Sequence, residues 1–148
     1  MEKLLFETSE KISFHEAAKF CENRNLQLIE INSADQLKII VNKLKTISDD
    51  VEWTYWGLSG HTALSYRGWW AGATDEAEEG TWVWTQSGNP VGNFIWFDNQ
   101  PDNAGGGNGG EGEDYLGLIN WRNWGNYDYR GHDVNGVFKL HPLCQQKR

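Results

Sequence analysis

Positive charge is scarce in this chain. It has 13 lysines and arginines against 21 aspartates and glutamates, which gives a formal net charge of −8 at pH 7. Proteins bind nucleic acids largely by neutralising phosphates with lysine and arginine. The balance therefore argues against a nucleic-acid partner and favours cations or neutral molecules as ligands.

Long apolar runs are also absent, and none approaches the roughly 20 residues that a membrane-spanning helix needs. Membrane insertion is therefore not expected. The first residues, Met1-Glu2-Lys3, lead into only a short apolar patch, which does not resemble a signal peptide. This start is compatible with a mature domain that carries an added initiator methionine, or with a cytosolic protein.

Cysteine is nearly absent, with only Cys21 and Cys144. One interpretation is a reduced, buried pair. The alternative is a disulfide that joins the two ends of the chain, which would stabilise the fold by roughly 4–5 kcal/mol in a chain-entropy model. The residues alone leave both open.

Aromatic residues, by contrast, are abundant: nine Trp, six Phe and five Tyr in 148 residues. A chain of this length fits one domain with a substantial core. No internal repeat or linker is evident, so we expect a single domain over residues 1–148.

The apolar periodicity changes along the chain. Two capping patterns, Ser13 to Glu16 and Ser33 to Gln36, each predict a helix start, and a helical apolar face follows the second. Asn23 and Asn25 suit the end of the first helix. Strands are expected within 4–6, 26–31, 53–58, 81–84, 115–121 and 134–144, with irregular structure at 61–72, a turn at 87–90 and a loop at 126–131. Early helices followed by strands indicate an α+β class.

The stretch from Gln100 to Asp114 gathers oxygen-bearing side chains around a run of glycines. It reads Gln100-Pro101-Asp102-Asn103, then glycines, then Glu113-Asp114, and Asp133 follows later. Calcium prefers several carboxylate and amide oxygens as ligands, so the stretch predicts a calcium-binding loop. The alternative is a solvated surface loop. An EF-hand is excluded, because the twelfth residue counted from Asp98 is glycine, and the dinucleotide-like glycine spacing lacks a flanking strand and helix.

Several of these motifs together resemble the C-type lectin-like family over nearly the whole chain. The matching segments are Tyr55-Trp56-Gly57-Leu58, Gln100-Pro101-Asp102, Glu113-Asp114 and Gly131-His132-Asp133. The resemblance implies two helices that flank antiparallel sheets, with a long calcium-binding loop region. It also implies a disulfide between Cys21 and Cys144. The family's second disulfide would use positions 115 and 136, which are Tyr115 and Gly136 here, so both partners are missing together.

The resemblance further implies two calcium sites. The primary site would use Gln100, Asp102, Glu113, position 132 and Asp133, with Pro101 in the cis form. An auxiliary site would use Asp75, Glu79, Asn103, Glu113 and Asp114. The alternative interpretation of Asp75 and Glu79 is a solvated acidic turn.

Two positions depart from the family pattern. His132 stands where an asparagine should supply an oxygen, and imidazole nitrogen is a poor ligand for calcium. Ala104 stands where galactose binders place a stacking tryptophan, so a ring from the segment after residue 120 would have to substitute. We expect the sugar-binding set to be Gln100, Asp102, Glu113, His132, Asp133 and Trp124.

The resemblance thus implies an extracellular, non-enzymatic lectin that binds galactose or N-acetylgalactosamine through calcium. Gln-Pro-Asp is the galactose-associated form of the family's sugar-selecting triplet. Such sites bind single sugars weakly, so homo-oligomerisation would supply affinity by multivalency. Two alternatives remain. One is a lectin-like interaction domain with a protein, ice or mineral ligand. The less favoured one is a hydrolase with Asp102 and Glu113 as paired carboxylates.

Overall fold

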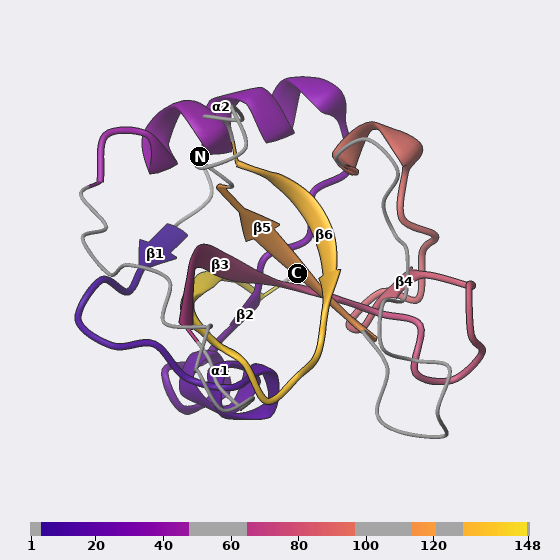
Figure 1. The fold of residues 1–148 in the computed structure, drawn as a ribbon, viewed down its shortest axis with the longest axis horizontal. Coiled ribbons are helices and arrows are strands. Elements are labelled where there is room, and N and C mark those ends of the chain that lie inside the picture. The colour runs from indigo at the N-terminus through magenta and orange to yellow at the C-terminus, as the bar shows by residue number, and fades with distance from the viewer. Residues whose placement is uncertain (1–3, 48–64, 97–113, 121–128, 148) are drawn as a thin grey trace, which may run out of the picture.

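The structure is a computed structural model that describes residues 4–47, 65–96, 114–120 and 129–147 (Figure 1). It contains two α-helices, one 3₁₀ helix and seven strands in these ranges, which confirms the α+β class. The elements are β1 Leu4–Phe6, α1 Phe14–Asn23, β2 Leu26–Leu28, α2 Ala34–Leu44, β3 Ser65–Thr74, β4 Val83–Trp84, η1 Asn93–Ile95, β5 Tyr115–Ile119, β6 Arg130–Val134 and β7 Lys139–Gln146.

Helix α1 begins and ends as the sequence predicts. The Ser13 hydroxyl accepts a hydrogen bond from the Glu16 N–H, and the Glu16 carboxylate accepts one from the Ser13 N–H at 3.1 Å, so the capping box is complete. Just beyond the helix, Asn25 has a positive φ of 60°. This left-handed conformation suits asparagine better than most side chains.

The second expected capping box forms only in part. Ser33 caps the Gln36 N–H at 3.1 Å, but the Gln36 side chain accepts from Asn32 N–H at 2.8 Å and not from Ser33. The reason is that the Gln36 amide also donates to the Glu30 carbonyl at 3.1 Å, which holds it one residue further back. Helix α2 nevertheless buries the predicted apolar face, which consists of Leu37, Ile40, Val41 and Leu44.

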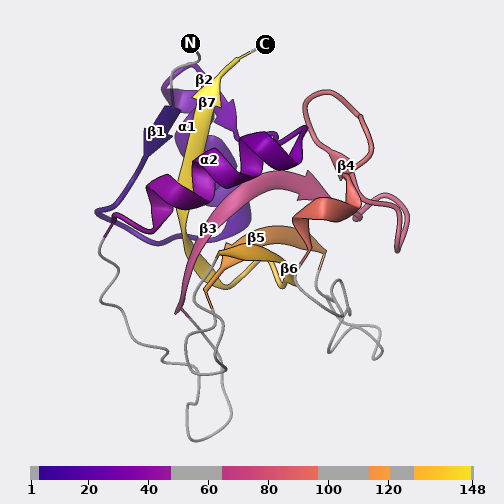
Figure 2. The same ribbon diagram turned by 90° about the horizontal axis from the view of Figure 1, so that it is seen from above.

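The sheet has the strand order β1-β7-β3-β5-β6, with β2 also paired to β7 and β4 to β3. Its pairs are antiparallel except β3–β7, which is parallel. The expectation of antiparallel sheets is therefore wrong for that pair. The last strand returns between β1 and β3, so β1 lies beside the end of β7 (Figure 2).

Two segments expected to be irregular contain strand residues in their described parts. Strand β3 covers most of 61–72, and β6 begins within 126–131. The misleading residues are glycines that allow close packing. A Cβ on Gly68 would lie 2.6 Å from Ile119 Cδ1, and one on Gly131 would lie 2.7 Å from the Ile95 carbonyl oxygen. These glycines are therefore packing positions within strands.

The remaining strand predictions differ from the structure at their ends. The strand expected over 26–31 ends at Leu28, that over 81–84 begins at Val83, and that over 134–144 divides between the end of β6 and β7. The turn around Gly88 is present, with φ of 78° at that residue. The strand expected over 53–58 lies outside the described residues.

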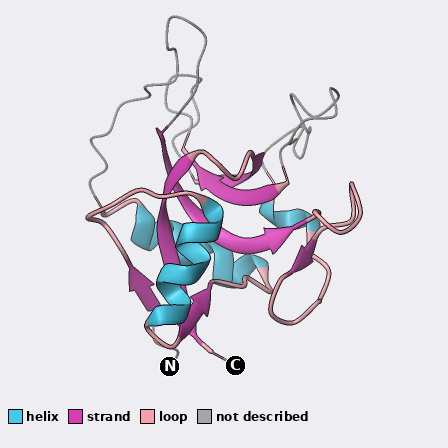
Figure 3. Cartoon of the chain, turned by 90° about the horizontal axis from the view of Figure 1, so that it is seen from below, coloured by secondary structure: helices cyan, strands magenta, loops and turns pink. Residues whose placement is uncertain are grey.

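The core lies on both faces of this sheet. Figure 3 distinguishes the strands of the sheet from the helices that flank it. Trp69 and Trp70 are successive residues of β3 and both are fully buried. Successive side chains of a strand point to opposite faces. Accordingly, Trp69 belongs to the same buried cluster as the apolar face of α2, and Trp70 belongs to the same cluster as that of α1.

The disulfide between Cys21 and Cys144 is present, and it joins α1 to β7 across a sequence separation of 123. The two positions of the missing second disulfide are also adjacent, because a Cβ on Gly136 would lie 2.7 Å from Tyr115 Cε2. The Tyr115 ring stacks on Phe14 with 4.3 Å between centroids. A packed aromatic ring thus occupies the place of the second bridge.

No helix among the described residues is long and apolar enough to cross a membrane.

Candidate metal centre

Two hydrogen bonds to the Asp114 backbone carbonyl hold the end of β3 against the residue that precedes β5. The Thr74 hydroxyl donates to the Asp114 carbonyl at 2.7 Å, and the Asp75 N–H donates to the same oxygen at 3.2 Å. The Asp75 carboxylate then accepts from the Gly80 N–H at 2.8 Å, and Gly80 has φ of 86°. The turn after β3 is therefore fixed at both of its ends.

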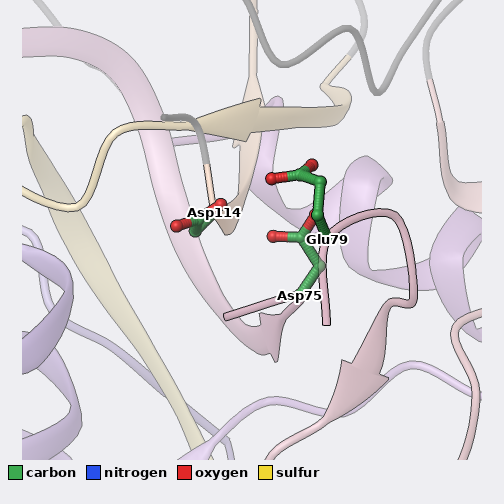
Figure 4. Close-up of side chains that lie close together, drawn as sticks. All are labelled: Asp75, Glu79 and Asp114. Atoms are coloured by element: carbon green, nitrogen blue, oxygen red, sulfur yellow. The ribbon is translucent and has the colours of Figure 1, made fainter. Parts of the chain in front are cut away.

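This arrangement brings three carboxylates together. One oxygen from each of Asp75, Glu79 and Asp114 lies within 4.8 Å of the other two (Figure 4). Asp75 is buried, Asp114 is half-buried and Glu79 is exposed. The cluster therefore has a buried base and an open side, which is the geometry of a site that a solute can enter.

The carboxylates are electrostatically unfavourable as they stand. The pKa of Asp114 is raised to about 6, first by burial and then by its closeness to the Asp75 carboxyl group, with Glu76 adding to the effect. The pKa of Asp75 is also raised, mainly by burial and by Glu79, against the Gly80 hydrogen bond that lowers it. Burial and like charge both favour the protonated form of a carboxyl group. A cation would reverse this preference.

The donor set fits calcium. Asp75 Oδ1 is buried and has no hydrogen-bond partner, although Asp75 is only 2% exposed. An ionised oxygen in this position is costly unless something compensates it. Calcium takes 6–8 oxygen ligands, and three carboxylates supply part of that shell. Asp75, Glu79 and Asp114 would hold the ion, with the remaining ligands from water or from other residues.

These three are the described members of the auxiliary site that the family resemblance implies. Its other members, Asn103 and Glu113, lie outside the described residues, as do Gln100, Asp102 and Trp124. The structure therefore brings the auxiliary set together as far as it describes that set. The primary calcium and sugar sites stay predictions.

His132 and Asp133 lie in β6 and are 5% and 3% exposed. They pair with Gly117 and Leu116 of β5, which begins directly after Asp114. Since successive strand residues face opposite sides, the two side chains do not point in the same direction. The side chains of Asp133 and His132 therefore lie on different faces of the sheet.

Sequence reasoning missed a polar contact network next to the carboxylates. The Tyr115 hydroxyl donates to Glu76 Oε2 at 2.7 Å, and His15 Nε2 lies 3.1 Å from the same hydroxyl. These residues and Asp114 border a cavity of about 300 Å³. No local sequence pattern pairs residue 15 with residue 115. The only signal in the sequence that could have suggested this network is the position of Glu76 next to Asp75.

Comparisons with known proteins place this geometry in context. No family model matches the chain. The C-type lectin mosGCTL-7 of Aedes aegypti is 25% identical over 156 residues, covering 99% of this chain and 85% of that protein. The carbohydrate-recognition domain of the mouse scavenger receptor C-type lectin superposes with a TM-score of 0.72 at 27% identity, covering 99% of this chain and 91% of that one. The carbohydrate-recognition domain of the human scavenger receptor C-type lectin superposes with a TM-score of 0.72 at 26% identity, covering 99% of this chain and 92% of that one. The fold is therefore the C-type lectin fold.

Proposed function

We propose that this C-type lectin-like domain, a single unit over residues 1–148, binds carbohydrate in a calcium-dependent manner and without catalysis. The observation that carries the proposal is the cluster of Asp75, Glu79 and Asp114, with its buried Asp75 oxygen that has no hydrogen-bond partner. The similarity to two carbohydrate-recognition domains supports the same conclusion.

Galactose or N-acetylgalactosamine is the proposed sugar. The support is the sequence Gln100-Pro101-Asp102 together with Glu113 and Asp133. When bound, calcium would supply coordination positions for two vicinal sugar hydroxyls. The chain's own carboxylates would accept hydrogen bonds from those hydroxyls, and the Gln100 amide would donate to one of them. The order of amide and carboxylate around the proline then selects the hydroxyl geometry.

The proposed setting is extracellular. The support is the Cys21–Cys144 disulfide, because such bonds persist in oxidising compartments. A shallow polar site of this kind binds one sugar at roughly millimolar strength, or about 4 kcal/mol. Homo-oligomerisation would raise the affinity for a multivalent glycan surface.

A second candidate is a lectin-like interaction domain that binds no sugar. His132 favours it, because this buried imidazole replaces the asparagine of the family pattern and offers calcium no oxygen. Under the main proposal, we expect the primary site to have one protein oxygen fewer than its relatives. Under the second candidate, the cluster at Asp75 binds calcium for stability alone.

Binding to a glycan array in calcium and in chelator tests the proposal. We expect binding to galactose-terminated glycans that is lost in chelator, and competition by galactose but not by mannose. Gln100→Glu with Asp102→Asn should shift the preference towards mannose. Gln86→Glu with Asp35→Asn makes the same chemical changes at exposed positions and should leave the preference unchanged. A calcium-stabilised protein that binds no glycan would instead support the interaction domain.

A further inference from the structure

A second cavity is lined by residues of α2, η1 and the start of β6. Figure 1 shows these three elements on the same side of the molecule. The volume of the cavity is about 320 Å³. Its walls carry Lys38 and Lys45 from α2 and Arg130 from β6, and its floor includes Leu37, Val41 and Tyr129. We call this set of six residues the cationic groove.

The charge of the groove contrasts with that of the chain. Three cations line it and no described carboxylate does, although the protein carries a net charge of −8. Lys38 and Lys45 are seven residues apart, which is two helical turns and about 10 Å along α2. Arg130 faces them from the start of β6. Cations on both walls can therefore contact one ligand from two sides.

Two cations of the groove also differ from lysines elsewhere in the described chain in whether they form ion pairs. Lys139 lies 3.8 Å from Glu16, and Lys147 lies 2.9 Å from Glu22. Lys38 and Arg130, by contrast, make no ion pair or hydrogen bond in the described part of the chain. Both are exposed. Their positive charge is thus available to an external anion.

The burial of the floor indicates what kind of anion fits. Leu37, Val41 and Tyr129 are 7%, 8% and 3% exposed, so the floor offers little apolar surface to an aliphatic tail. The wall combines the cationic and amide groups of Lys38, Lys45, Arg130 and Asn42 with the carbon atoms of exposed Ala34 and half-buried Phe94. The volume lies at the lower end of the range for ligand pockets, about 300–1,000 Å³. A short anion that carries polar groups and a small apolar face fits this mixed lining, and the overall negative charge opposes a long polyanion.

We propose that the cationic groove binds an acidic saccharide of one or two units that carries a sulfate or carboxylate. Lys38, Lys45 and Arg130 donate charge-assisted hydrogen bonds to the acidic group. The Asn42 amide contacts hydroxyls, and the half-buried Phe94 ring at the groove's edge lies against the ring of the sugar. The choice of a saccharide among anions rests on the proposed lectin function. The groove itself needs no calcium, because no described carboxylate lines it.

Titration of the full chain with 3′-sulfated lactose, followed by NMR amide shifts and calorimetry, tests this assignment. In chelator and at about 0.05 M salt, we expect the sulfated sugar to bind and to shift amides of α2 and β6, while plain lactose does not. Raising the salt to about 0.5 M should weaken binding.

Lys38→Gln with Arg130→Gln should lower the affinity by about tenfold. Lys43→Gln with Lys19→Gln removes the same charge from exposed helix positions outside the groove and should change it less than twofold.

Three outcomes would overturn the assignment. They are an absence of binding by the sulfated sugar, an equal loss in the two double variants, or equally tight binding by an acidic peptide of the same charge. The last would identify a peptide groove. The proposed lectin function fails separately, if lactose does not bind in calcium. Sulfated lactose that binds in chelator and responds to the groove variants would still support the groove in that case.

Discussion

One end of the molecule contains the Cys21–Cys144 disulfide, and another contains the carboxylate cluster of Asp75, Glu79 and Asp114. The two ends differ in what stabilises them. At the first, Cys21 and Cys144 link α1 to β7 covalently, and β1 and β2 both pair with β7. At the second, backbone contacts hold Asp75 and Asp114 in place while their charges repel, with Glu79 beside them. The first end needs no ligand for its stability, whereas the repulsion at the second is relieved by a bound cation or a bound proton.

This difference indicates which conditions each end responds to. A covalent bond and backbone hydrogen bonds are insensitive to calcium and to mild acid. A cluster of carboxylates responds to both, because either an ion or a proton relieves its repulsion. The following predictions separate the two ends, beginning with the largest expected effect.

Removal of the disulfide should have the largest effect. For Cys21→Ala with Cys144→Ala, we expect the free energy of unfolding to fall by about 4–5 kcal/mol, because a long loop in the unfolded chain is released. Urea denaturation measures this. The loss should be the same in calcium and in chelator. A loss that appears in only one of the two conditions would show that the ends are coupled.

Asp75→Asn should have the next largest effect, and its sign should depend on calcium. The cluster's ion should stabilise the native protein by about 2.7 kcal/mol at 100 times its dissociation constant, and the variant should lose most of this. In chelator, the variant should be as stable as the wild type or slightly more, since an amide adds no negative charge and keeps an acceptor for the Gly80 N–H.

Thermal unfolding and calcium calorimetry measure both halves of this prediction. Glu78→Gln is the matched control, because Glu78 is exposed, lies in the same turn and is outside the three-carboxylate cluster. It should retain the full response to calcium. If calcium stabilises the Asp75→Asn protein as much as the wild type, the cluster does not bind the ion.

The sequence predicts the first end better than the second. Local signals sufficed for α1, because its capping box and Asn25 act within a few residues. The cysteine pairing came from the family resemblance, since the residues alone left it open. Strand β3 escaped prediction because Gly68 and Gly72 resemble loop residues until the packing against Ile119 and Leu28 is known.

The candidate metal centre was only partly predictable. The acidic turn with Asp75 and Glu79 is visible in the sequence, but its closeness to Asp114 depends on the pairing of β3 with β5. The Tyr115 contacts to Glu76 and His15 join three distant segments, and no periodicity encodes them. The cationic groove likewise arises from tertiary packing between α2 and β6.

The pH dependence of stability in chelator should include a contribution from the carboxylate end, through Asp114. The pKa of Asp114 is raised from 3.8 to about 6 in the folded state. The native protein therefore binds more protons than the unfolded chain within that window, and its stability falls as the pH rises through it. Because Asp114 is partly solvated, we expect a loss of only about 1 kcal/mol.

Comparison with Asp114→Asn isolates this effect. Glu7 and Glu16 have lowered pKa values because each accepts hydrogen bonds from a nearby serine, and they act in the opposite direction in both proteins. The difference between wild type and variant, from urea denaturation at several pH values, should therefore carry the Asp114 contribution. A difference that is constant from pH 4 to about 7 would contradict the raised pKa.

Tyr115→Phe should give the smallest change, and it tests the boundary between the two ends. The phenylalanine ring keeps the stack on Phe14 and the packing against Gly136, so the cavity cost is small. What is lost is the hydroxyl that donates to Glu76 and lies near His15. Glu76 is exposed and can bond to water instead, so we expect a loss of about 0.5–1 kcal/mol in the free energy of unfolding.

Because Glu76 follows Asp75 directly, a change in calcium affinity beyond about twofold would show that this hydroxyl positions the cluster. An unchanged affinity with the expected small loss of stability would show that Tyr115 only fills the place of the missing second disulfide.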